Sequence, residues 1–341
     1  MTLVKIGKVE DVDTMLDIAF RRARERREMS HSTIKGRSDI SRLDKSRRAE
    51  KQRVLGAGKS LRGQLDAIEA AFPSFNQLAP FYQELVRTVL DLDELKRSLG
   101  AVRWVSDKIG GLTKDSVRRI DACVELTKIN AIRREHYGRC ASTLKQIGKD
   151  LISLDKARKT LKDLPTIKTS VPTVVIAGIP NVGKSTLLSA LTGAKPAIQP
   201  YPFTTRHLML GYANIDGKQV QFIDTPGILD RPASDRNPIE RRAALAIRHL
   251  AKLILFVIDP TLHSGFSVEE QLSLLKDLRK EFDAPFVVLV NKADLMTSDI
   301  KIPGVRLVRI AAKTKQGLEG VLDAIKPVLR ESDVVQGGLD L

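Results

Sequence analysis

Apolar residues in the first half of the chain recur every three or four positions, which places them on one face of a helix. The longest such stripe could lie on one helix, or on two helices broken near Gly100. Because several stripes of this kind can bury their apolar faces against one another, they predict an all-α helical bundle. The stripes are Phe81, Leu85, Val89, Leu92, Leu95, Leu99, Val102 and Val105; Leu144, Ile147, Leu151, Leu154, Ala157, Leu161 and Leu164; Val117, Ile120 and Val124; and Val12, Met15, Leu16 and Ala19.

After Pro172 the pattern changes to short, continuous apolar runs that alternate with segments of helical composition. The runs are 174–177, 220–223, 253–258, 286–290 and 305–310, and the helical segments lie around 185–193, 238–250, 267–281 and 317–329. Continuous apolar runs are typical of strands covered on both faces, so this alternation predicts an α/β domain with a doubly wound, mostly parallel sheet. Asp216-Gly217, which follows the run 208–215, predicts a hairpin that adds one antiparallel edge strand.

We therefore expect a helical bundle domain at 1–168, an α/β domain at 169–331 and a short tail at 332–341. A chain of 341 residues with 42% hydrophobic residues is long enough for two such domains. Its longest apolar runs fall far short of the ~20 residues of a membrane span. The acidic start does not resemble a secretory signal, and the two cysteines form no CxxC motif. These features favour a cytoplasmic protein without a membrane association.

The net charge of +16 is concentrated in the first half of the chain. Residues 1–170 sum to +13, and residues 21–62 alone sum to +10. A solvated helical face is one interpretation of such a run. Beside a nucleotide-binding domain, a surface for RNA phosphates is favoured, because so dense a charge repels itself unless a polyanion lies against it. Arg47, Arg48, Lys51 and Arg53 are the cations that we expect to contact RNA.

The sequence GIPNVGKST at 178–186 has the GxxxxGKS spacing of a phosphate-binding P-loop, placed between a predicted strand and a predicted helix. In such a loop the backbone N–H groups surround the phosphates, Lys184 reaches the β- and γ-phosphates, and Ser185 supplies an oxygen to Mg2+. The residues predicted to hold the phosphates are Asn181, Val182, Gly183, Lys184, Ser185 and Thr186.

Asn291-Lys292-Ala293-Asp294 follows the strand predicted at 286–290. A carboxylate at Asp294 can accept hydrogen bonds from N1 and the exocyclic N2 of guanine, whereas adenine offers no matching pair of donors. An NKxD tetrapeptide alone is weak evidence, but after a P-loop it favours GTP over ATP. Asn291, Lys292 and Asp294 therefore form the predicted base site.

Asp224-Thr-Pro-Gly227 ends the second predicted strand. We expect Asp224 to hold Mg2+ through water and the Gly227 amide to meet the γ-phosphate. Thr204 and Thr205 lie between the P-loop and this strand, and Thr205 is the one expected to close on Mg2+. Lys184, Thr205 and Gly227 are thus the predicted catalytic residues, and Ser185, Thr205 and Asp224 the predicted metal ligands.

In order and identity these loops resemble those of translation-factor-type GTPases of the Obg group. Three segments are similar to the nucleolar GTP-binding protein 1 family, namely QPYPFTT at 199–205, DTPGILD at 224–230 and DRNPIE at 235–240. Phe72-Pro73, LAPFY at 78–82 and LPTI at 164–167 carry the resemblance into the helical half.

The resemblance implies a helical bundle before a P-loop GTPase domain, and action on large ribosomal subunit precursors. It also implies that Ala311, Ala312 and Lys313 form the loop that meets guanine O6, although alanine replaces the usual serine at the first of these positions. The chain stops at Leu341 without the long basic extension of eukaryotic members, so we expect a short, archaeal-like form.

The leading hypothesis is a monomeric, Mg2+-dependent GTPase that binds GTP and GDP, contacts ribosomal RNA through its bundle and times a step of large-subunit assembly. Turnover without a partner should be slow, because Ile228 and Leu229 after Gly227 cannot orient water. Asn181 could hold K+ against the phosphates, as in some relatives, or only shape the loop. Two alternatives remain: a GTP-binding scaffold with negligible hydrolysis, and a signalling GTPase at an acidic membrane surface, against which the lack of a C-terminal lipidation cysteine counts.

Overall fold

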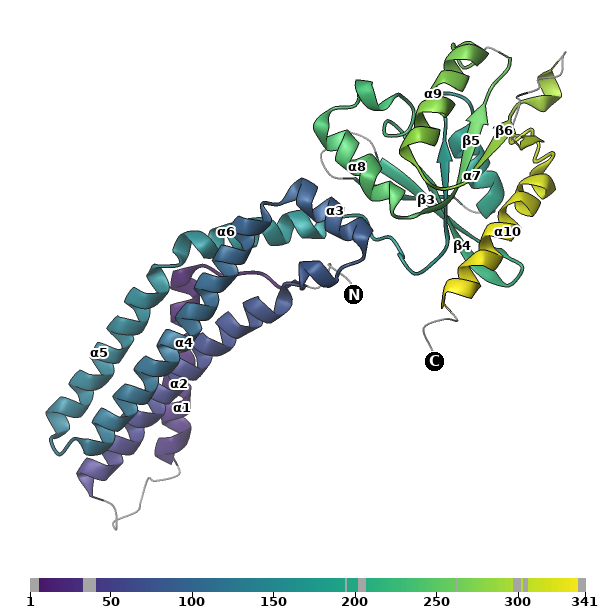
Figure 1. Cartoon of the computed structure of the whole chain (residues 1–341). Coiled ribbons are helices and arrows are strands. Elements are labelled where there is room, and N and C mark those ends of the chain that lie inside the picture. Colours follow the sequence, from purple (N-terminus) through teal and green to yellow (C-terminus); the bar gives the residue numbers. More distant parts are fainter. Residues whose placement is uncertain are drawn as a thin grey trace. The chain divides into compact units, whose positions relative to one another are not determined.

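The computed structural model describes residues 6–32, 41–193, 195–201, 207–261, 263–296, 302 and 306–336. The chain forms two compact units (Figure 1). The first comprises Met1–Ser74 and Leu90–Lys162, and the second comprises Phe75–Val89 and Asp163–Leu341. An all-α unit thus precedes most of an α/β unit, and the predicted fold class is confirmed.

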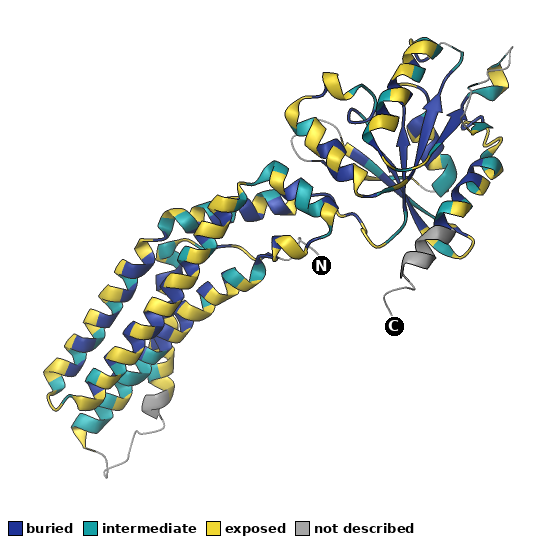
Figure 2. Ribbon diagram, viewed as in Figure 1, coloured by how far each residue is buried: buried dark blue, intermediate teal, exposed yellow. Residues whose placement is uncertain are grey.

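The first unit is the predicted helical bundle. Its helices are α1 (Val12–Ser32), α2 (Arg42–Ala71), α4 (Leu92–Ala122), α5 (Leu126–Lys145) and α6 (Gly148–Lys162). Helix α2 packs against α1, α4 and α5, and α4 also packs against α6. In Figure 2 the faces of these helices that lie toward one another carry most of the buried positions, shown in dark blue, and the outer faces are mostly exposed, shown in yellow. No described helix is long and apolar enough to cross a membrane.

The longest apolar stripe is divided between two helices, but not at the predicted place. Gly100 lies inside α4, and the break falls at Leu90 and Asp91, between α3 (Pro80–Val89) and α4. The Asp91 side chain accepts hydrogen bonds from the N–H groups of Asp93 and Glu94 and so begins α4. A good N-cap residue therefore decides the boundary, whereas a single glycine is tolerated inside a long packed helix.

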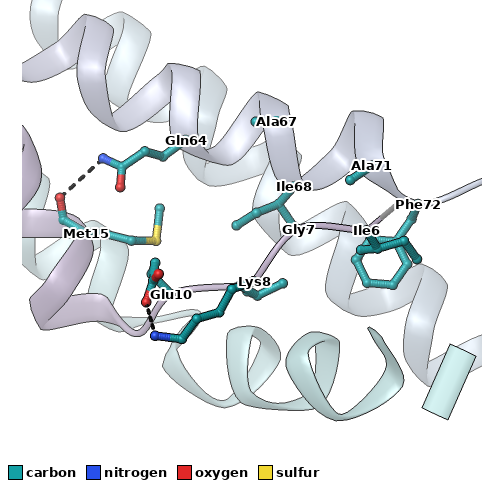
Figure 3. A pocket seen from close by; sticks show the side chains of 11 residues that line it. Ile6, Gly7, Lys8, Glu10, Met15, Gln64, Ala67, Ile68, Ala71 and Phe72 are labelled. Atoms are coloured by element: carbon teal, nitrogen blue, oxygen red, sulfur yellow. Dashed lines mark hydrogen bonds and ion pairs between the residues drawn. The ribbon is translucent and has the colours of Figure 1, made fainter. Parts of the chain in front are cut away.

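The N-terminal segment before α1 packs across α2 and borders a small, mostly apolar cavity (Figure 3). Ile6 and Phe72 lie at one end of this cavity and Met15 at the other. The Gln64 side-chain amide donates to the Met15 carbonyl oxygen at 3.3 Å. This contact ties the start of α1 to α2.

A polar cluster lies inside the bundle between α4 and α5. Ser116 Oγ is 3.2 Å from His136 Nδ1, and Cys140 Sγ is 3.6 Å from His136 Nε2. Burial lowers the pKa of His136 to about 4 and raises the pKa of Cys140 to about 12. His136 is therefore neutral at physiological pH, and Cys140 is a protonated thiol of low reactivity.

The second unit is built on a seven-stranded sheet with the order β2-β3-β4-β1-β5-β6-β7. Every pairing is parallel except β2 with β3 and β3 with β4. Figure 1 shows α7 and α10 on one face of the sheet and α8 and α9 on the other. The strands are β1 (Thr173–Ala177), β2 (Ala197–Pro200), β3 (His207–Ile215), β4 (Lys218–Asp224), β5 (Ala251–Ile258), β6 (Phe286–Val290) and β7 (Leu307–Arg309). Besides α3, the helices are α7 (Lys184–Thr192), α8 (Pro238–Arg248), α9 (Val268–Glu281) and α10 (Leu318–Gln336), and short 3-10 turns lie at Phe75–Gln77, Ala233–Asp235 and Ala293–Leu295.

The predicted hairpin joins β3 to β4, with Asp216 and Gly217 at φ 50° and 82°, as a tight type I′ turn requires. The prediction that β3 is an edge strand was wrong. The short strand β2 pairs antiparallel with β3 and occupies that edge. With only four residues and a proline, β2 carries too little pattern to be recognised from the sequence.

Helix α3 belongs to the second unit although it precedes most of the bundle in the chain. It packs against α8, and its buried residues are Phe81, Leu85 and Val86. The Tyr82 hydroxyl lies 3.0 Å from the carbonyl oxygens of Pro165 and Ile167 and accepts a bond from the Ile167 N–H at 2.9 Å. The compact units consequently do not follow the predicted boundary at residue 168, because packing joins α3 to a domain distant in sequence.

Candidate nucleotide-binding site

Four of the predicted loops follow parallel strands at their carboxyl ends. The P-loop follows β1, Asp224 ends β4, Asn291 follows β6, and Ala311 lies just after β7. Because these strands are parallel, the loops meet at one edge of the sheet, which is where open α/β sheets bind ligands. The structure therefore brings together the described parts of the predicted site. Thr204 and Thr205 lie outside the described residues.

The P-loop has a backbone that demands glycine at two positions. Gly178 and Gly183 have φ of 139° and 97°, in the left-handed region that disfavours side chains. A Cβ at Gly178 would lie 2.5 Å from the Val257 carbonyl oxygen, and one at Gly183 would lie 2.3 Å from Asn291 Nδ2. Asn181 also has a positive φ, of 64°, and its side chain is exposed. The loop leads directly into α7, whose N-terminal N–H groups attract anions.

Lys184 and Asp224 place opposite charges beneath this loop. The mostly buried Lys184 ammonium donates to the Ile179 carbonyl oxygen at 2.7 Å, and the Ser185 hydroxyl donates to Asp224 Oδ2 at 2.7 Å. Burial raises the pKa of the Asp224 carboxyl, while the Lys184 charge and the Ser185 hydrogen bond oppose that rise.

The corner between Ser185 and Asp224 fits Mg2+ chemically. Within the described part of the chain, Asp224 Oδ1 is fully buried and has no hydrogen-bond partner, which is costly unless another group meets it. The described residues contain no group of three or more histidine, cysteine or acidic side chains that could hold a metal ion. One carboxylate and one hydroxyl instead match a cation that keeps several waters and binds substrate phosphates.

Asn291 connects two loops of the site. Its Nδ2 donates to the Val182 carbonyl oxygen at 2.7 Å, and its Oδ1 accepts from the Ala312 N–H at 3.0 Å. Only 3% of the residue is exposed. Asn291 therefore holds the P-loop and the 311–313 loop at a fixed separation, a role that the tetrapeptide alone did not indicate.

Lys292 and Asp294 flank the same corner. Lys292 has a left-handed backbone, and its ammonium is 2.5 Å from Oδ2 of the fully buried Asp259. Burial alone would raise the pKa of Asp259, but hydrogen bonds from Lys292 and Thr261 bring it below its ordinary value. Asp294 is exposed at the rim. The sequence alone did not identify Asp259 as a residue of this site. Its position directly after the apolar run 253–258, at the carboxyl end of a strand, was the feature that could have indicated it.

Of the third loop, Ala311 and Ala312 are buried and Lys313 is exposed. The Ala293 N–H donates to the Ile310 carbonyl oxygen at 3.0 Å, which joins this loop to the one that carries Asp294. The predicted base residues consequently share one corner of the sheet edge.

The segment after β4 is tightly anchored. The Gly227 N–H donates to the Asp230 carboxylate at 2.9 Å, and Ile228 and Leu229 are buried. The fully buried Arg236 guanidinium makes two bonds of 2.7 and 2.8 Å to Glu281, and Asn237 with Glu240 forms a capping box at the start of α8. Asp230 and Arg236 have no role that their sequence motifs indicate, although both lie in the motifs that carry the family resemblance.

Two family models match the chain. One, described as the NOG1 N-terminal helical domain, matches residues 4–168, and the other, described as a 50S ribosome-binding GTPase, matches residues 173–292. Together they span the bundle, α3, the P-loop, the 224–227 loop and the start of the base loop.

Several proteins are similar to this chain, and some of them carry the name nucleolar GTP-binding protein 1. An uncharacterized protein of Methanocaldococcus jannaschii is 42% identical over 75% of this chain and 72% of its own length. Nucleolar GTP-binding protein 1 of Encephalitozoon cuniculi is 35% identical over 72% of this chain, which spans only 46% of that protein. A crystal structure of a putative nucleolar GTP-binding protein 1 from Plasmodium falciparum aligns with a TM-score of 0.46 at 27% identity, over 52% of this chain and 95% of that one. On its sequence matches, the chain belongs to the nucleolar GTP-binding protein 1 family of GTP-binding GTPases.

Proposed function

We propose that this chain hydrolyses GTP and uses its nucleotide state to time a step in the assembly of the large ribosomal subunit. The observation that carries the proposal is the pair of hydrogen bonds by which the Asn291 side chain joins the phosphate loop to the 311–313 loop. A phosphate-binding loop and a guanine-binding loop held at a fixed separation favour one ligand of defined length, a guanine nucleotide.

In this proposal Asp294 selects guanine by accepting from its N1 and N2, and the Ala312 loop meets guanine O6. Lys184 and the N–H groups of the P-loop hold the phosphates. Ser185 and Asp224, with Thr205, hold Mg2+, which when bound neutralises charge on the β- and γ-phosphates. The buried, unpartnered Oδ1 of Asp224 supports the metal assignment.

Turnover is slow without a partner in this account. Ile228 and Leu229, at 2% and 1% exposure, are apolar and packed away, so their side chains cannot orient an attacking water. Asn181 is an exposed residue of the P-loop, and its side-chain oxygen is the group that we propose holds K+ against the phosphates. A partner or this cation then supplies the missing charge stabilisation.

Ribosomal RNA is the partner that the positive charge of the bundle favours. Contacts within the bundle, however, favour other cations as its binding residues than those expected from the sequence. Arg47 bonds to the Cys123 carbonyl oxygen and to Asp44, Lys51 pairs with Asp121 at 2.7 Å, and Arg53 pairs with the buried Glu50 at 2.9 Å. Three of the four cations predicted to meet RNA thus already have polar partners within the bundle domain.

Free positive charge lies instead along the groove between α1 and α2. Arg22, Arg26 and Lys59 line this groove together with one acid, Glu25. The three cations are exposed and form no salt bridge with a described residue. Gly63 also lines the groove, and a Cβ placed there would meet nothing within 4 Å. Packing does not require a glycine at this position, and a glycine inside α2 lowers the stability of the helix. The missing side chain leaves room beside the cations, which fits the phosphates of a nucleic-acid backbone.

The test of the RNA proposal is a charge reversal in this groove. Arg22→Glu with Arg26→Glu should weaken binding of ribosomal RNA and lower the slope of log affinity against log salt by about two, since each lost phosphate contact releases about one counterion fewer. Lys276→Glu with Arg279→Glu, on the exposed face of α9, carries the same charge change and serves as the control. An equal slope for both variants would remove the groove from the proposal.

A further inference from the structure

The Gly227 amide, which the proposed function assigns to the γ-phosphate, already has an anionic partner within the chain. Its N–H donates to Asp230 Oδ2 at 2.9 Å. We propose that Asp230 is a specificity-determining residue that sets the preference between GTP and GDP by competing with the γ-phosphate for this amide. The inference rests on the proposed guanine nucleotide site and adds a residue to it.

The two groups compete because they are chemically alike. A carboxylate oxygen and a phosphate oxygen are both anionic acceptors, and each forms a charge-assisted hydrogen bond with a backbone N–H. One N–H cannot hold both at full strength, and two anions at one donor also repel each other. GDP lacks the γ-phosphate and makes no demand on this amide, so only GTP must displace Asp230.

The charge of Asp230 also reaches the metal corner. It is among the influences that raise the pKa of Asp224, whose carboxylate is the proposed Mg2+ ligand. Asp230 therefore adds negative charge at the place where GTP brings its own. Displacing the carboxylate from Gly227 relieves this repulsion when GTP binds.

The surrounding contacts confine the change to a small movement. Arg231 is paired with Glu240 at 2.6 Å, and Arg236 is fixed to Glu281, so the backbone beyond Asp230 is anchored to α8 and α9. Gly227 itself has φ of 80°, which only glycine adopts readily, and its peptide can rotate at low cost. Rotation of the Asp230 side chain or of the Gly227 peptide is therefore enough to free the amide.

A purely structural role for Asp230 makes a different prediction. If the bond only stabilises the turn after β4, removing the carboxylate should weaken GTP and GDP equally and lower the melting temperature. Competition instead changes the ratio of the two affinities, because the γ-phosphate alone is affected.

The experiment measures equilibrium affinities for GDP and for a non-hydrolysable GTP analogue, at fixed Mg2+, in the 341-residue chain. Asp230→Asn keeps an acceptor for Gly227 and removes the charge, whereas Asp230→Ala removes both. Asp230→Ala should raise the ratio of GTP-analogue to GDP affinity by about tenfold, the size of one charge-assisted hydrogen bond, and Asp230→Asn should raise it by less, with GDP affinity nearly unchanged in both. Asp235→Asn, an exposed acid in the same segment, is the control for net charge and should leave the ratio unchanged.

An unchanged ratio in both Asp230 variants, with intact GDP binding, would overturn the proposal while leaving the nucleotide site standing. An equal rise in Asp235→Asn would also overturn it, since general charge and not the Gly227 contact would then be responsible. Failure of the wild-type chain to bind either nucleotide would instead refute the proposed function on which the inference rests.

Discussion

Replacement of Asn291 by alanine should disconnect the phosphate loop from the 311–313 loop. In the native chain the Asn291 side chain donates to the Val182 carbonyl oxygen at 2.7 Å and accepts from the Ala312 N–H at 3.0 Å. Alanine can make neither bond. The change leaves the predicted guanine acceptor, Asp294, untouched, so any loss of affinity reports on the connection between the loops.

The size of the effect follows from the two lost bonds. Each buried hydrogen bond contributes about 1 kcal/mol net, and an unsatisfied buried N–H or carbonyl costs about 1 to 3 kcal/mol. The loops can relax toward water, so we expect a loss of roughly 2 to 4 kcal/mol in nucleotide binding, which corresponds to about 30- to 1,000-fold in Kd.

Titration with a fluorescent GDP analogue measures this loss, and a thermal melt of the same samples reports stability. Asn291→Asp keeps the acceptor for Ala312 but replaces the donor to Val182 with a buried negative charge, so it should lose at least as much nucleotide affinity as Asn291→Ala. Asn214→Ala changes an exposed asparagine on β3 and should leave both readouts unchanged.

The account would be refuted if Asn291→Ala bound GDP within about twofold of the wild-type chain while remaining folded. In that case the two loops would keep their separation without the Asn291 hydrogen bonds. The proposed guanine nucleotide site would then lose its main supporting observation.

Three further predictions concern the base, the cation and the bundle. Asp294→Asn should weaken GTP by several powers of ten and partly restore binding of xanthosine triphosphate, whereas equal competition by ATP in the wild type would contradict guanine selection. Single-turnover hydrolysis should be faster in K+ than in Na+ at matched ionic strength, and Asn181→Ala should lose that difference while keeping GTP affinity; equal rates in the two salts would remove K+. Folding lowers the pKa of His136 from 6.5 to about 4, so as the pH drops this histidine takes up a proton in the unfolded chain before it does so in the folded chain. The free energy of unfolding of the bundle should therefore be highest above pH 6.5 and fall by roughly 3 kcal/mol toward pH 4. Urea unfolding against pH should show this loss in the wild type, and His136→Gln should show a smaller one.

The sequence was most informative where one short segment carries both the residue types and the geometry. The spacing of Gly178, Gly183 and Lys184 predicts a phosphate loop because the turn needs glycines within a few residues of the lysine. The parallel strands were equally accessible, since their apolar runs are continuous and covered on both faces.

Features that depend on contacts between distant segments were not accessible. Nothing near Phe81 or Leu85 indicates that α3 packs against α8, because an apolar stripe specifies burial and not the partner. The pairing of Lys51 with Asp121 is likewise invisible in a count of charges, so the basic run at 21–62 predicted a polyanion surface but did not indicate which of its cations already have an acidic partner in the fold. Asn291 was assigned to the base site from its tetrapeptide, but its tie to Val182 spans more than a hundred residues.

The measurement that tests the central claim most directly is GTP hydrolysis under single-turnover conditions by the 341-residue chain, with and without large ribosomal subunit precursors. The account predicts slow release of phosphate by the chain alone and faster release with the precursors, and it predicts that Arg22→Glu with Arg26→Glu abolishes the acceleration while leaving the basal rate unchanged. Phosphate release at the same rate with and without precursors, or at no measurable rate in either case, would contradict a GTPase that times a step of large-subunit assembly.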